Sequence, residues 1–212
     1  MQTFGRMLGM GAAALLLAAT AVGAGTESTS PAFFVTLQGE NAVAEEPAGS
    51  LWPAGAGMTY DSVSPDGGLV LATSSAEGRV YAFDARSGKS LGTVTVGKRP
   101  KGVKISPSGR VAIVANEGAG TISLLDTGAL KVTRTIPVGK MPHNTAFSPD
   151  SRWAYVTVQG EDAIAVVDVD KGVKVDTIPV GKTPHNVDIS GDGETLYVAN
   201  NASEDLAIID AP

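Results

Sequence analysis

Four aspartates recur along this chain at a constant spacing of 42 residues: Asp84, Asp126, Asp168 and Asp210. Three glycines keep the same spacing, each followed by a lysine, and so do three prolines (Gly97, Gly139, Gly181; Pro100, Pro142, Pro184). A repeat of about 40–45 residues with strand-like content is typical of a β-propeller blade. The period therefore constrains the fold more than any other feature of the sequence.

Each repeat divides into four short runs that are rich in β-branched and aromatic residues. In the unit 139–180 these runs are 143–148, 153–158, 163–167 and 173–180, and turn-forming residues separate them. One four-stranded sheet of this composition has two apolar faces, which only neighbouring sheets can cover. The sequence predicts an all-β propeller of four-stranded antiparallel blades.

The blade boundaries follow from the register of the repeat. Full blades are expected at 55–96, 97–138 and 139–180, with a partial blade at 181–212. Residues 34–44 match 155–165, which indicates another partial blade at 34–54 that begins on its second strand. About 4–5 blade-equivalents result. The chain is then a small closed ring, an open arc completed by a second copy, or a remnant of a longer gene. We expect closure or self-association, because an open arc exposes an apolar face.

The amino-acid sequences of the repeats resemble those of the YVTN-type β-propeller family. The closest matches to its signature tetrapeptide are Tyr155-Val156-Thr157-Val158 and Tyr197-Val198-Ala199-Asn200, and the resemblance covers about residues 34–210. It implies an exported propeller, here a short form, since the family usually has seven blades. It does not imply one particular activity.

The N-terminus predicts export. Arg6 precedes an apolar, small-residue stretch, and Val22-Gly23-Ala24 fits a cleavage site, so residues 1–24 are expected to be a signal peptide and 25–33 a lead-in to the propeller at 34–212. We expect a periplasmic or secreted protein with no membrane association after signal removal. No cysteine is present, which excludes disulfides, c-type haem attachment and thiolate metal sites.

Charge argues against nucleic acid as a partner. The chain has 16 basic and 22 acidic residues, and removal of Arg6 with the signal leaves 15 − 22 = −7. Nucleic-acid binding needs a basic surface. No nucleophile elbow, P-loop or zinc-protease motif is present, so no catalytic residue is assigned, and binding is expected rather than catalysis.

The candidate site combines two kinds of residue that topology places at one end of the strands. Both histidines begin an innermost strand and precede an asparagine, as His143-Asn144 and His185-Asn186. Lysines from the same links are expected to add positive charge that could steer an anionic ligand (Lys98, Lys101, Lys140, Lys182). Neutral imidazole is a common metal ligand, so His143 and His185 are also candidate metal ligands. The alternative is that repetition copies them and that they only support loops.

Three functions stay open on this basis. The first is a binding module whose loop face takes a protein partner or a small anionic ligand, with no cofactor required by the sequence. The second, implied by resemblance to periplasmic propellers of d1-haem or quinoprotein type, is a cofactor- or metal-associated redox accessory protein using His143 or His185. The third, implied by resemblance to propeller lactonases, is a hydrolase of sugar lactones.

Overall fold

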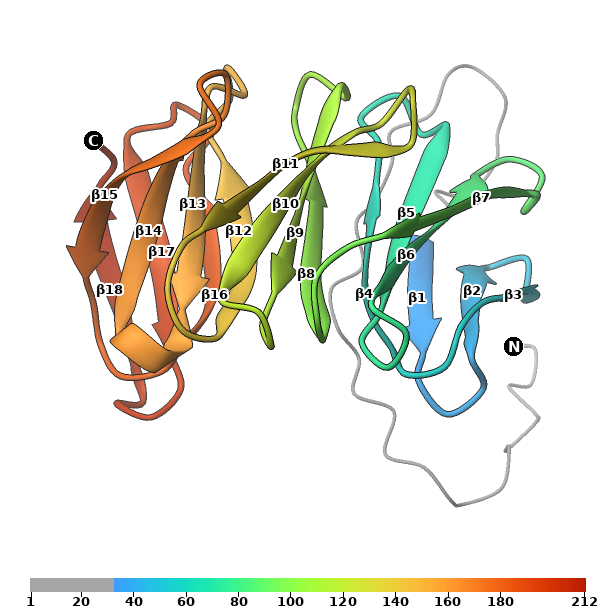
Figure 1. Ribbon diagram of the computed structural model, residues 1–212, viewed down its shortest axis with the longest axis horizontal. Helices are drawn as coiled ribbons and strands as arrows, with labels where there is room; N and C mark the ends of the chain where they lie inside the picture. Colours follow the sequence, from blue (N-terminus) through green and yellow to red (C-terminus); the bar gives the residue numbers. More distant parts are fainter. Residues whose placement is uncertain (1–32) are drawn as a thin grey trace, which may run out of the picture.

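The computed structural model describes residues 33–212, which form five antiparallel sheets (Figure 1). The predicted signal peptide and most of the lead-in lie outside the described residues. The sheets run in chain order, with these strands: β1 Phe33–Leu37, β2 Ala42–Glu46, β3 Ser50–Pro53; β4 Met58–Val63, β5 Leu69–Ser74, β6 Arg79–Asp84, β7 Ser90–Thr95; β8 Pro100–Ile105, β9 Val111–Asn116, β10 Thr121–Asp126, β11 Lys131–Pro137; β12 Pro142–Phe147, β13 Trp153–Val158, β14 Ala163–Asp168, β15 Val173–Pro179; β16 Pro184–Ile189, β17 Thr195–Asn200, β18 Asp205–Asp210.

This architecture confirms the predicted fold class. Within every sheet each strand pairs with the next in sequence, as in the blades of a propeller. The predicted loop after β13 contains one 3₁₀ turn, Gln159–Glu161. Within residues 33–212 we find no helical segment with the length and apolar character that a membrane crossing requires.

Three of the four repeated aspartates close turns between third and fourth strands. The Oδ1 atoms of Asp84, Asp126 and Asp168 accept hydrogen bonds from backbone amides two or three residues further on. A short side chain that bonds its own backbone stabilises such a turn in place of a strand partner. These three aspartates therefore have a structural role.

Neighbouring sheets pack face to face and form the core. Tyr155, Ile164 and Val166 of the fourth sheet lie in one cluster with Val187, Leu196 and Val198 of the fifth. Equivalent clusters join the second sheet to the third and the third to the fourth. Apolar faces that one sheet cannot bury alone are thus buried between sheets.

The sheets form an open series within the described residues. The principal contacts between sheets all join consecutive ones, and the innermost strands β4, β8, β12 and β16 lie beside one another. Figure 1 shows the first and last sheets at opposite sides of the molecule. Closure of a ring is not seen in residues 33–212.

Side-chain hydrogen bonds identify the place of β1 in its blade. Thr73 of β5 and Thr157 of β13, both on second strands, donate to a backbone carbonyl of the next sheet's first strand, at 2.7 Å and 3.3 Å. Thr36 of β1 donates in the same way to the carbonyl of Thr59, at 3.0 Å. β1 therefore occupies the position of a second strand.

Candidate functional site

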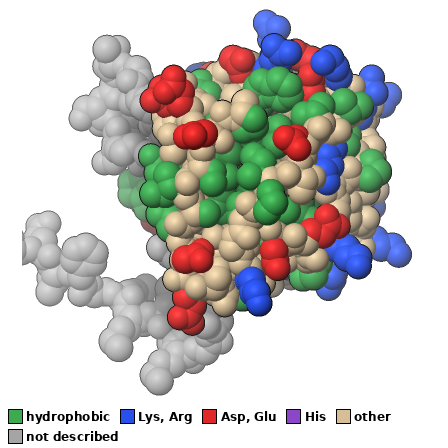
Figure 2. All heavy atoms as spheres, turned by 90° about the vertical axis from the view of Figure 1, so that its left-hand side faces the viewer, with side chains coloured by type: hydrophobic (Ala, Val, Ile, Leu, Met, Phe, Trp, Pro, Cys, Tyr) green, Lys and Arg blue, Asp and Glu red, His purple; other side chains and the backbone are tan. Residues whose placement is uncertain are grey.

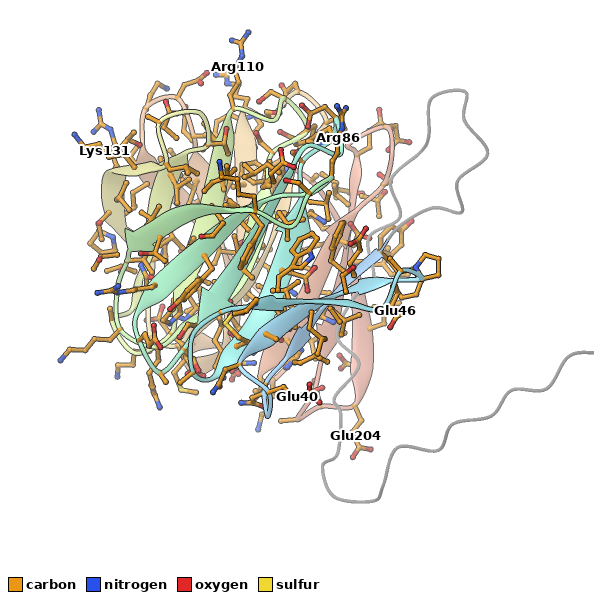
Figure 3. The ribbon with its side chains drawn as sticks, turned by 90° about the vertical axis from the view of Figure 1, so that its right-hand side faces the viewer. Glu40, Glu46, Arg86, Arg110, Lys131 and Glu204 are labelled. Carbon is orange, nitrogen blue, oxygen red and sulfur yellow. The ribbon has the colours of Figure 1, made fainter. Side chains whose placement is uncertain are left out.

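The candidate residues lie at one end of the strands, where the links into the innermost strands meet the loops between second and third strands. Figure 3 shows Glu40, which lies between β1 and β2, and Glu204, which lies between β17 and β18, at the lower end of the molecule. Arg86 and Arg110, which lie in the other turns, and Lys131, the first residue of β11, lie at the upper end. The loops between second and third strands thus lie at the opposite end from the other turns.

His143 is buried at the start of β12 and uses both ring nitrogens. Its Nδ1 lies 3.3 Å from the carbonyl oxygen of His185, and its Nε2 lies 3.4 Å from the hydroxyl of Tyr60. A carbonyl can only accept, so Nδ1 carries the proton and Nε2 accepts from Tyr60. His143 therefore links three sheets as a neutral imidazole.

A glycine allows this close approach. Tyr60 belongs to β4 and reaches His143 in β12 past β8, where Gly102 occupies the position of Tyr60 in the repeat. A Cβ at Gly102 would lie 2.6 Å from the carbonyl oxygen of His143 and 3.0 Å from the Cα of Asn144. The missing side chain lets the inner strands β8 and β12 pack against each other.

His185 and the two asparagines form the more accessible part of the site. The rings of His143 and His185 are 4.1 Å apart between centroids. Asn144 donates from Nδ2 to Oδ1 of Asn186 at 2.8 Å, and Nδ1 of His185 lies 3.2 Å from the same oxygen. His185 is partly exposed and Asn186 is exposed. The structure thus brings together all four of these predicted residues, but only His143 is buried.

Burial sets the protonation of the buried members. Desolvation, followed by repulsion from His185 and Lys101, lowers the pKa of His143 from 6.5 to about 4. Desolvation, with the charge of Glu117 as a second cause, raises the pKa of Tyr60 to about 12. Both groups are neutral at pH 7, so the centre of the site holds hydrogen bonds and no charge.

The lysines surround this centre but alternate with carboxylates. Lys98, Lys140 and Lys182 are exposed, and Lys101 is partly exposed. The backbone amide of Lys140 donates to Oε1 of Glu161 at 2.9 Å, and Arg99 is paired with Glu117 at 3.7 Å. Loops between second and third strands supply these carboxylates. The face therefore presents mixed charge.

The geometry fits a metal or haem poorly at His143 and better at His185. A ligating imidazole needs a free nitrogen lone pair, and Nε2 of His143 is directed at Tyr60. Among residues 33–212 no group of three or more His, Cys, Asp or Glu side chains could hold a metal ion. One surface groove is lined by residues that include Arg110 and Asp126, another by residues that include Glu77 and Lys98, and neither lining contains a histidine.

Asp61 is an unusual residue that sequence reasoning missed. Neither oxygen of its carboxylate is accessible to solvent or has a hydrogen-bond partner. Its position in the repeat is held by Val103, Thr145 and Val187 in the later sheets. Burial raises the pKa of Asp61 to about 7. The nearby backbone of Thr36 lowers the pKa by a smaller amount, although no hydrogen bond of normal distance and angle joins the two. The sequence signal was available, because a carboxylate replaces valine at a repeated position.

The sequence matches one family of known proteins. Residues 92–212, more than half of the chain, match the YNCE-like beta-propeller family. This chain belongs to that family. The narrower resemblance to YVTN repeats stays a prediction. Among curated proteins, no sequence matches this chain.

A solved structure shares the fold at low sequence identity. Dihydro-heme d1 dehydrogenase NirN, solved in complex with DHE, superposes with a TM-score of 0.69 at 21% identity, covering 84% of this chain and 41% of that one. Hydrazine synthase of Kuenenia stuttgartiensis gives a TM-score of 0.47 at 15% identity, covering 85% of this chain and 92% of that one. This chain therefore spans less than half of the NirN chain, and the likeness is one of fold.

Proposed function

We propose that this protein is an exported β-propeller module that binds a polypeptide partner through the face formed by His185, Asn186, Asn144 and the surrounding lysines. The observation that carries the proposal is the contrast within the site. Its centre is rigid, since His143 ties three sheets together, while amide and imidazole groups beside it are open to solvent. Binding residues held on rigid strands lose little freedom on association.

The surface chemistry favours a macromolecule over a small anion. Lysines and carboxylates alternate around the asparagines, and Arg99 is already paired with Glu117. The rim of a protein interface is polar and accessible to solvent. A small anion would gain more from an uncompensated cluster of basic groups.

A cofactor-associated role is the second candidate, and His185 is the observation that favours it. This histidine is partly exposed, so it is the better placed of the two to ligate a metal or haem iron from the surface. The fold shared with NirN is compatible with that role. A lactonase-like activity has no set of residues in this site that supports it.

Lysine footprinting on the mature protein tests the first proposal. Amine-reactive labelling would be measured in buffer and in a native extract of the producing cells. We expect protection of Lys101, Lys140 and Lys182, whereas Lys89 and Lys131, which lie among the opposite turns, keep their labelling. The double variant with His185→Ala and Asn186→Ala should lose the protection while its thermal unfolding is unchanged.

Two results would overturn the proposal. Equal protection of both lysine groups would show nonspecific masking, and protection that the double variant keeps would place the interface elsewhere. The small-anion alternative is supported instead if phosphate or citrate alone gives the same protection. Metal analysis and visible absorption of the protein purified from its native compartment test the cofactor role, which a colourless and metal-free preparation contradicts.

A further inference from the structure

The last sheet has an outward face that the earlier sheets bury. Exposed fractions are 40% for Tyr197, 57% for Leu206 and 63% for Ile208, all in β17 and β18. Figure 2 shows hydrophobic side chains gathered on this end of the molecule. Isolated apolar residues on a surface are ordinary, but three neighbours on one sheet face indicate an interaction surface.

The repeat shows what covers this face elsewhere. The residues 42 positions earlier are Tyr155, Ile164 and Val166, each at most 2% exposed, and they pack on Val187, Leu196 and Val198 of the following sheet. The same positions of the second and third sheets are also buried, each against the sheet that follows (Leu71, Val80, Ala82; Ile113, Ile122, Leu124). At three junctions, then, the residues at these positions are buried by the facing side of the next sheet.

Polar groups of the inner strand β12 also bond the following sheet. His143 bonds the carbonyl oxygen of His185 in the following sheet, and Asn144 bonds the side chain of Asn186 there. At the last sheet, Nδ1 of His185 lies instead beside Oδ1 of Asn186 in its own strand. The polar contacts of a blade junction are therefore missing at the same place as the apolar ones.

The other end of the series carries the complementary face. In the first sheet, Val35 and Ala44 correspond to Val156 and Ala165. In the fourth sheet, Val156 and Ala165 pack against the third sheet. Beside them on the side turned away from the second sheet lie Phe33 and Leu51, which are 38% and 55% exposed. The chain thus has the two halves of a blade junction, one at each end.

We infer that copies of this chain associate head to tail, with the β16–β18 face of one copy packed on the outward β1–β3 face of the next. The junction would repeat the kind of apolar cluster that joins neighbouring sheets inside the chain. Such an interface is heterologous, so closure into a ring or growth into a longer assembly depends on the rotation per copy.

Light scattering on the mature protein tests this inference. We expect a mass of two or more copies when the protein concentration is well above the dissociation constant of the assembly. Ile208→Asp should yield monomers, since it places a charge at the centre of the junction, and Leu51→Asp should do the same from the other end. The matched control is Leu91→Asp, which changes an exposed leucine on β7 (47% exposed) and should leave the assembly intact.

Mixing the two monomeric variants distinguishes this arrangement from others. Ile208→Asp keeps a normal first sheet and Leu51→Asp keeps a normal last sheet, so an equimolar mixture should form a dimer through one intact junction. A monomeric unaltered protein, or a mixture that stays monomeric, would overturn the inference. Circular dichroism of each variant checks that its fold is kept. Light scattering of the purified protein needs no other partner, so this inference can fail while the binding proposal stands, and the reverse.

Discussion

Asp61 should be the most pH-sensitive residue for stability, and its replacement by valine, which two of the other repeats have at this position, should stabilise the protein at neutral pH. Both carboxylate oxygens are buried without a partner. The pKa of Asp61 is raised from 3.8 to about 7, chiefly by desolvation. In the unfolded chain the same carboxyl would ionise near its ordinary pKa.

The direction and size of the pH dependence follow from the difference between the pKa of Asp61 in the folded and unfolded states. Since the folded-state pKa is the higher one, the folded state holds the proton between pH 4 and 7 and the unfolded state does not. The contribution of Asp61 to stability is therefore greatest below pH 4 and is lost as pH rises to 7, by about 1.4 kcal/mol per pH unit and about 4 kcal/mol in all. Asp61→Val removes that loss.

The assay is urea unfolding from pH 4 to 8 for the natural protein and Asp61→Val. We expect Asp61→Val to gain about 2–4 kcal/mol at pH 7.5 and much less at pH 4. Thr145→Val is the matched control, because Thr145 holds the same repeat position and its buried Oγ1 also lacks a partner. That change should add about 1 kcal/mol, independent of pH.

The pH dependence is the decisive result. If the gain from Asp61→Val is the same at pH 4 and pH 7.5, the carboxyl does not change protonation as argued. If the variant is less stable than the natural protein at pH 7.5, the carboxylate has a stabilising partner and the reasoning from burial is wrong.

Three further changes test the packing and the site. His143 should not titrate above about pH 5 in an NMR titration, and stability should fall as pH drops from 6.5 towards 4, because the folded state favours the neutral ring. Gly102→Ala should cost about 1–3 kcal/mol, since its Cβ meets a backbone oxygen, while Gly191→Ala, with no atom within 4 Å of the new Cβ, should be nearly neutral in urea unfolding. Tyr155→Ala should cost about 3–5 kcal/mol in the same assay. Tyr197→Ala, at the equivalent but exposed position, should cost less than about 1 kcal/mol in dilute monomer.

Each of these has a plain contrary outcome. A His143 resonance that titrates near pH 6.5 would show a solvated ring. If Gly102→Ala costs as little stability as Gly191→Ala, the approach of β8 to β12 is not tight. Equal losses for the two tyrosine variants in the monomer would mean that the last sheet is covered in solution by another part of the same chain.

Sequence periodicity was enough to predict the sheets and most strand limits. Insertions would have broken the 42-residue spacing, so each strand could be placed by comparison with its copies, and the turns at Asp84, Asp126 and Asp168 followed from their chemistry. The meeting of His143 with His185 was also predictable, since equal positions in adjacent repeats become neighbours. The narrower family label, export and the binding role stay predictions.

What the sequence alone determined is the blade, because a repeated pattern of apolar residues specifies the same local sheet each time. What only the tertiary structure decided is the environment of each copy. His143 is buried against Tyr60 while His185 is partly exposed, and Tyr155 is covered while Tyr197 is not. The physical reason is that burial and pKa depend on the neighbouring sheet, which differs at the end of the series even where the residues are the same.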